Sequence, residues 1–284
     1  MTFSETILLG ALAGFTIYLS LPFGRIELLS RRARVGLAMF AVGVLAFLFV
    51  DVFGHAFDML DKAMGDFRAG KDGLGHVLGL VALMAGGFTA GTAGLATLER
   101  RLRMKEPPPV AGGSAEAIAA EHVEAFDEHA ADLRRRALRT GMTIAAAIGL
   151  HNFAEGLAIG VSASTGAIGL ATVLIVGFAL HNATEGFGIV GPLGDVRPSW
   201  SWLAVAGLVG GGPTFVGSIV GYNVTSEPLE LAFYALSGGA ILYVIGEVWN
   251  GMRRLGHREL GLWLLVLGFM VGVATDLVVV YGGA

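Results

Sequence analysis

Apolar residues along this chain occur in eight long runs that are separated by polar connections. The runs cover residues 5–22, 35–53, 74–97, 139–162, 167–190, 201–222, 229–249 and 260–281. Each run has about the 18 or more residues that an α-helix needs to cross the hydrocarbon core of a bilayer. The pattern therefore predicts an all-α protein, a polytopic transmembrane bundle of eight helices that forms a single membrane domain.

The composition supports this fold class. The chain of 284 residues is 54% hydrophobic and 15% charged, and its 44 glycines suit the close approach of helices in lipid. The first run has no basic residue before it and no small-residue cleavage signature, so we interpret it as a helix and not as a signal peptide. The net charge of −4 is too small to indicate a nucleic-acid partner.

Lysine and arginine are concentrated in alternate connections. The connections after the first, third, fifth and seventh runs hold 16 of the 19 basic residues. By the positive-inside rule these connections face the cytoplasm, and both termini are extracytoplasmic. We expect a multi-pass protein in the lipid bilayer of a bacterial plasma membrane.

The connection after the third run is the longest, and it separates residues 1–97 (helices 1–3) from residues 139–284 (helices 4–8). This cytoplasmic loop, residues 98–138, breaks at a Glu-Pro-Pro-Pro segment and ends in a polar stretch that could form an amphipathic helix. His122 and His129 lie in that stretch among acidic residues. They could receive or sense metal, or belong to a plain amphipathic or disordered loop.

Two similar polar motifs interrupt the fourth and fifth runs, HNFAEG at 151–156 and HNATEG at 181–186. Residues four apart lie on one face of a helix, so His151 pairs with Glu155 and His181 with Glu185. The two helices are joined by a tight turn around residues 162–169 and should run antiparallel, with the two pairs at matched depth. Two imidazoles and two carboxylates are therefore predicted to converge near the middle of the bilayer.

This side-chain set suits a divalent transition metal. The chain has no cysteine, and imidazole and carboxylate are the usual non-sulfur ligands of zinc and related ions. A bound divalent ion would cancel two carboxylate charges that are costly in hydrocarbon. Without the ion, repulsion should keep at least one glutamate protonated, so we expect metal loading to move protons.

Other interpretations of the motif residues stay open. The whole set could serve helix packing through hydrogen bonds, although two copies at matched depth favour a functional site. Asn152 and Asn182 project to one side of their histidines. They could be further ligands, groups that orient the ligands, or packing amides.

A polytopic chain with HNxxEG on two neighbouring central helices resembles the ZIP (Zrt/Irt-like) family of metal transporters, over nearly its whole length. The resemblance implies transport of zinc, or of iron, manganese or cadmium, into the cytoplasm, with the ion as substrate and no catalytic cofactor. It implies a movement of helices 1, 4, 5 and 6 against the others, and a homodimer. The metal residues that it implies are His151, Asn152, Glu155, His181, Asn182 and Glu185.

Three positions depart from the family pattern. Ala154 and Thr184 stand where the family usually has a proline before the motif glutamate, so the helices should be straighter here. Gly156 and Gly186 could still supply some bending. In the sixth helix Gly212 stands before Pro213 where many members have a glutamate, so we expect one principal metal site.

Two functions other than transport are considered. An intramembrane metal-dependent hydrolase could use the same site to activate water. The chain has no HExxH motif, however, and every ionisable motif residue is already assigned to the metal, so we expect that it is not an enzyme. A metal-binding member that transports little, as a sensor or a relic of a channel, is the second alternative.

Weaker polar signals lie outside the two motifs. Asp51, His55 and Asp58 share one face at the outer end of the second helix, and could draw cations toward a pore or simply form a solvated helix end. Asp72 and His76 lie in the next outer segment and could contribute. Asp276 in the last run could line the pore or pair with neighbouring polar residues.

Overall fold

The computed structural model describes residues 1–26, 30–102, 115–164, 166, 168–223, 226–253 and 255–281. Within these ranges the side chains of 102, 115–129, 168–170, 172–174 and 278–280 are not described. Every regular element of the described chain is helical, which confirms the predicted fold class.

The helices follow the order of the predicted runs. The first is α1 (Phe3–Phe15) with the short 3₁₀ segments η1 (Thr16–Leu19) and η2 (Leu21–Arg25), and the second is α2 (Arg31–Arg68). The third is continuous through α3 (Leu74–Thr89), the π-helical η3 (Ala90–Gly94) and α4 (Leu95–Leu102). The others are α5 (Ala115–Ser164), α6 (Ile168–Val190) with η4 (Gly191–Leu193), α7 (Trp200–Asn223), α8 (Glu227–Arg253) and α9 (Arg258–Tyr281).

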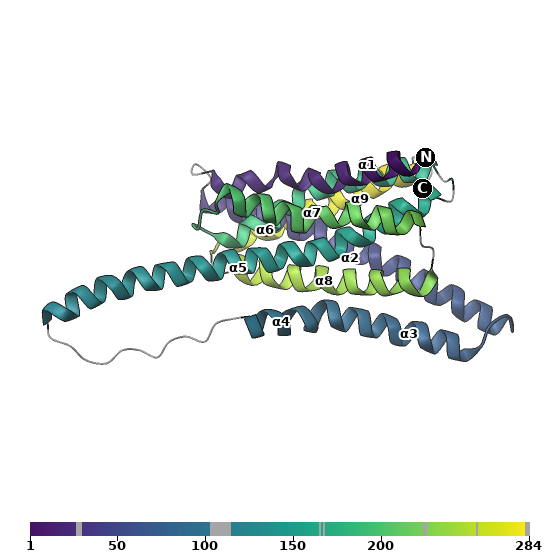
Figure 1. The fold of residues 1–284 in the computed structure, drawn as a ribbon, viewed down its shortest axis with the longest axis horizontal. Coiled ribbons are helices and arrows are strands. Elements are labelled where there is room, and N and C mark those ends of the chain that lie inside the picture. The colour runs from purple at the N-terminus through teal and green to yellow at the C-terminus, as the bar shows by residue number, and fades with distance from the viewer. Residues whose placement is uncertain are drawn as a thin grey trace.

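The protein is a multi-pass integral membrane protein of eight long helices. Seven of them contain a described window that is long and apolar enough to cross a membrane, and the eighth, α6, has 23 residues of which only part is described. The N- and C-termini lie at the same end of the bundle, as an even number of crossings requires (Figure 1). We call this the terminal end, and the opposite end the basic end, because the starts of α2 and α9 there carry Arg31 and Arg258.

Two helices extend farther than the apolar runs indicated. The acidic segment after the second run is the C-terminal part of α2, which continues as helix to Arg68. Ala56 and Ala63 on this extension are buried in a small cluster with Val77 and Leu80 of α3 and Leu231 of α8, so tertiary packing keeps it helical. The polar stretch of the long connection after the third run is likewise helical in backbone, as the first turns of α5.

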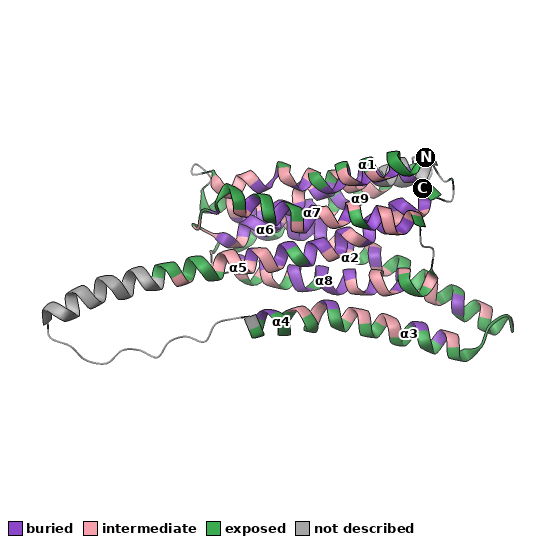
Figure 2. Cartoon of the chain, viewed as in Figure 1, coloured by how far each residue is buried: buried purple, intermediate pink, exposed green. Residues whose placement is uncertain are grey.

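Burial is uneven across the bundle (Figure 2). Buried residues concentrate on the inner helices, whereas the most apolar windows of α3–α4 and α9 are only 17% buried. Exposed apolar side chains on these two helices include Leu78, Trp263 and Val266. An exposed apolar helix surface is the form expected where the solvent is lipid.

Glycines allow α5 and α7 to pack closely against each other. Gly217 of α7 lies so near the Phe153 carbonyl of α5 that a Cβ atom there would clash with the backbone. Gly156 of α5 meets the Thr214 carbonyl in the same way. Gly156 therefore serves helix contact, and it brings the first motif against α7.

The turn between α5 and α6 has the form that antiparallel neighbours need. Gly166 has φ 82°, a conformation that favours glycine, and its N–H bonds the Ala163 carbonyl at 3.3 Å. The predicted tight turn around residues 162–169 is therefore present at Gly166. It places the two motifs side by side in the core.

Candidate metal centre

All six motif residues lie inside the bundle, on α5 and α6. Their relative exposures are His151 1%, Asn152 0%, Glu155 5%, His181 7%, Asn182 0% and Glu185 0%. Polar residues buried this completely need polar partners. The partners that they find divide the six into three groups.

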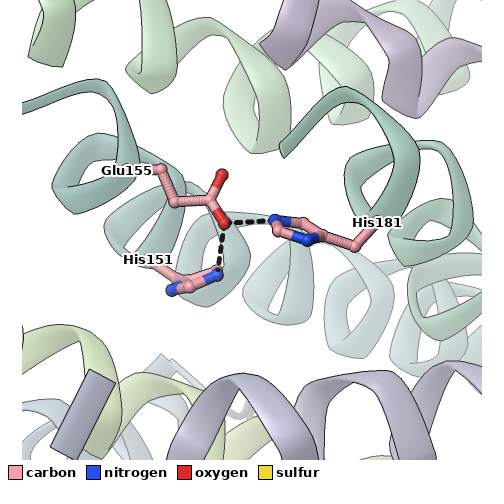
Figure 3. Close-up of side chains that lie close together, drawn as sticks. All are labelled: His151, Glu155 and His181. Atoms are coloured by element: carbon pink, nitrogen blue, oxygen red, sulfur yellow. Dashed lines mark hydrogen bonds and ion pairs between the residues drawn. The ribbon is translucent and has the colours of Figure 1, made fainter. Parts of the chain in front are cut away.

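The first group brings three predicted residues to one point. Glu155 lies between the two imidazoles, with Oε1 2.9 Å from Nε2 of His151 and 2.6 Å from Nε2 of His181 (Figure 3). One atom from each of the three residues lies within 4.8 Å of the others, a spacing that could hold a metal ion. The i, i+4 pair on α5 and the antiparallel partner from α6 thus meet as the sequence predicted.

Glu185 lies beside this cluster but is turned toward Asn152. Nδ2 of Asn152 donates to Oε2 of Glu185 at 3.0 Å and to the Gly210 carbonyl of α7 at 3.0 Å. Oε1 of Glu185 is 4.0 Å from Nε2 of His151. The fourth predicted ligand is therefore adjacent to the cluster and hydrogen-bonded to the Asn152 amide.

Asn182 and Ser237 make the remaining contacts. Nδ2 of Asn182 donates to the Ala13 carbonyl of α1 at 3.3 Å, so this amide connects α6 to α1. Oγ of Ser237 on α8 lies 2.9 Å from Nδ1 of His151. A hydrogen bond at Nδ1 fixes the orientation of an imidazole whose Nε2 faces a ligand, a common arrangement around metal ions.

Several buried polar atoms of the site lack a hydrogen-bond partner among the described residues. They are Oδ1 of Asn152, Oε2 of Glu155, Oδ1 of Asn182 and Oε1 of Glu185. Unsatisfied buried groups are costly unless something completes them. The donor set of imidazole nitrogen and carboxylate oxygen would be completed well by a divalent transition metal.

A cavity of about 510 Å³ joins the cluster to the terminal end of the bundle. It is lined by His151, Glu155 and His181 at its base, and by Asp51, His55, Glu230, Tyr234 and Asp276 nearer the terminal end. On the other side of the cluster, toward the basic end, Ile144, Ile148 and Ile189 are fully buried. The cluster is therefore approached from one end and backed by packed aliphatic side chains at the other.

Some of the weaker polar residues noted in the sequence line this cavity, and others do not. Asp51 and His55 line this cavity and lie 3.9 Å apart, and Asp276 lines it too. Asp72 pairs with His76 at 3.7 Å where α3 begins, and Asp58 is exposed; none of these three belongs to the cavity wall. The side chains of His122 and His129 lie outside the described residues.

Sequence reasoning missed three polar residues of the site and its cavity. Ser237 sits in an apolar stretch of α8 where a single hydroxyl gives no periodic signal. Glu230 and Tyr234 are four residues apart, and their hydrogen bond of 3.1 Å is the kind that an i, i+4 search of α8 would have suggested.

The part of the chain that carries both motifs matches a known protein family. Residues 99–271, which include both motifs, match the sequence model of the family described as ZIP zinc transporter. The chain is also similar to "Zinc transporter ZupT" of Clostridium perfringens (strain 13 / Type A), with 29% identity over 221 residues. That alignment covers 72% of this chain and 75% of the relative.

Proposed function

Because the chain belongs to the ZIP zinc transporter family, we propose that it carries zinc into the cytoplasm by way of the His151–Glu155–His181 cluster. The family consists of metal transporters and not of enzymes, which decides against the intramembrane hydrolase. Iron, manganese and cadmium share enough of zinc's ligand chemistry to be further substrates of the same site.

The observation that carries the proposal is the position of Glu155 between two imidazoles. His151 and His181 would bind the ion through Nε2 as neutral ligands, and Glu155 would bind it through a carboxylate oxygen. Three nitrogen and oxygen donors leave a fourth position of a tetrahedral ion free. Glu185, 4.0 Å from His151, is placed to fill it and to neutralise the second charge.

The cavity supports a direction of transport. Asp51, Glu230 and Asp276 place three carboxylates along the wall between the terminal end and the cluster. A cleft lined with one sign of charge raises the local concentration of the opposite ion. With the basic end in the cytoplasm of a cell whose plasma membrane holds the protein, ions would reach the cluster from outside and leave inward.

The test is zinc uptake into proteoliposomes that contain the purified protein. We expect saturable uptake by the native chain, and a loss of roughly a hundredfold or more at sub-saturating zinc in the double variant Glu155→Ala, Glu185→Ala. The matched control, Glu227→Ala with Glu259→Ala, removes two acidic side chains outside the site and should transport normally.

Two results would contradict the proposal. Unchanged uptake in the double variant would show that the ion takes another route. Zinc binding by the native chain without uptake would show a sensor instead of a transporter. Anomalous scattering from a zinc-soaked crystal would add the position of the ion, expected at the cluster.

A further inference from the structure

A second cavity of about 510 Å³ lies at the basic end of the bundle, away from the metal centre. Its wall is formed by α2, by the end of α8 and by the start of α9. Val35 and Met39 belong to α2, Trp249, Met252 and Arg253 to α8, His257 to the connection between α8 and α9, and Arg258 to the start of α9. The volume is within the range of small-molecule binding sites.

The polar part of this wall is basic. Arg253 and Arg258 both line the cavity, and none of its described lining residues is a carboxylate. Within the described part of the chain, no carboxylate forms an ion pair with either arginine. The helix α9 begins at Arg258, so the partial positive charge of its N-terminus lies at the same place.

The remaining wall is apolar. Val35, Met39 and Met252 are side chains of the hydrophobic core, and Trp249 packs partly buried against it. Tryptophan is enriched where a bilayer meets water, and Trp249 lies one turn before Arg253. A site with cationic groups on one side and aliphatic groups on the other fits an amphiphile with a negative headgroup.

Two cavity-lining residues of the α8–α9 connection have positive φ angles. Gly256 has φ 82°, and His257 has φ 57°, the only positive φ of a non-glycine residue in the described chain. Such a conformation is unfavourable for a side chain with a Cβ and persists where the surrounding structure requires it. Here it forms the tight connection that puts both arginines on one cavity.

We propose that this cavity binds an anionic phospholipid of the cytoplasmic leaflet. Its phosphate would contact Arg253 and Arg258, and an acyl chain would follow the apolar wall at Val35 and Met39. Basic pockets between membrane helices on the cytoplasmic side are suited to anionic headgroups. The apolar wall and the location at the end of three membrane helices favour a lipid over a free phosphate ion.

The proposal can be tested on the full-length protein in a neutral detergent. The measurement is the affinity for dioctanoyl phosphatidylglycerol, from the shift in thermal unfolding temperature, with dioctanoyl phosphatidylcholine and inorganic phosphate as comparison probes. We expect phosphatidylglycerol alone to stabilise the native chain. The double variant Arg253→Gln, Arg258→Gln should bind it roughly 30-fold more weakly.

Two control variants make the result specific. Arg134→Gln with Arg135→Gln removes the same charge from exposed positions on α5 and should bind like the native chain. Arg253→Lys with Arg258→Lys keeps the charge and should retain most of the affinity. Equal stabilisation by both lipids, equal stabilisation by inorganic phosphate, or full binding by the glutamine variant would each overturn the proposal.

Discussion

At the scale of single residues, the molecule places one carboxylate oxygen between two imidazoles at the base of a cavity. Oε1 of Glu155 faces Nε2 of both His151 and His181. The contacts behind these groups, from Ser237 to His151 and from Asn152 to Glu185, hold the rings and the second acid in position. Orientation by such supporting groups commonly determines how tightly a metal site binds.

The contact between Ser237 and His151 gives the first prediction. The variant Ser237→Ala should bind zinc about 10-fold more weakly, because the imidazole loses the hydrogen bond that fixes its orientation. Isothermal titration of the purified protein measures this affinity. Thr143→Ala is the control, since its hydroxyl bonds a carbonyl of its own helix α5 and lies outside the site. Equal affinities of the two variants would show that Ser237 does not support the site.

The sequence predicted that the four proposed ligands would lie close together, but not their exact grouping. The spacing of four within each motif and the turn between the helices place His151, Glu155 and His181 together without further information. The Glu185 side chain points toward Asn152, and the Asn152 amide is held in turn by the Gly210 carbonyl of α7. Asn152 and Gly210 are 58 residues apart in the sequence, so this is a tertiary contact. Ser237, on α8, is fixed by helix packing that no local pattern encodes.

At the scale of elements, close contact between α5 and α7 positions the first motif. Pro213 interrupts the hydrogen bonding of α7 because it has no N–H, and the Gly210 carbonyl nearby accepts a bond from Asn152. The apolar runs predicted both helices, but not that their glycines would bring the two backbones together. Likewise, the runs ended α2 at residue 53, because hydropathy does not record packing of a polar helix against its neighbours.

The glycine contacts give the second prediction. Gly217→Ala should lower the free energy of unfolding by about 1–3 kcal/mol, because its Cβ would meet the Phe153 carbonyl and force α7 away from α5. Thermal unfolding in detergent, followed by circular dichroism, measures the loss.

Gly79→Ala is the matched control for this variant. Gly79 lies within α3 with no atom within 4 Å of an added Cβ, so alanine should leave stability unchanged or raise it by up to about 1 kcal/mol. A Gly217 variant as stable as this control would mean that the contact between α5 and α7 is looser than the structure shows.

At the scale of the whole molecule, the cavity that holds the buried His and Glu side chains lies toward the terminal end of the bundle. The cavity leads from the terminal end to the metal centre, while the isoleucines behind the centre are packed. The distribution of arginine and lysine predicts which end faces the cytoplasm, but no sequence pattern indicates which end of the bundle is open. That property depends on how the helices lie in this one conformation.

The absence of cysteine from the chain makes this arrangement directly testable. A single cysteine at Ala158, which lines the cavity, should react with a membrane-impermeant thiol reagent added outside intact cells. A cysteine at Ala147, which is fully buried toward the basic end, should not. Labelling is measured by the mass added to the purified protein.

Zinc supplies the control for this labelling experiment. Saturating zinc should slow the reaction of the Ala158→Cys variant if the ion occupies the base of the cavity. Labelling of Ala158→Cys only in inside-out vesicles would reverse the predicted orientation, and equal labelling of both variants would show a continuous opening through the bundle.

The three isoleucines between the metal centre and the basic end bear on how an ion leaves the centre. Because these side chains are fully buried, we expect each delivered ion to require a rearrangement of the helices, and rearrangements of this kind take microseconds to milliseconds. The delivery rate should therefore level off as zinc is raised. It should also fall steeply on cooling or in a stiffer bilayer, as expected of a carrier and not of an open conduit.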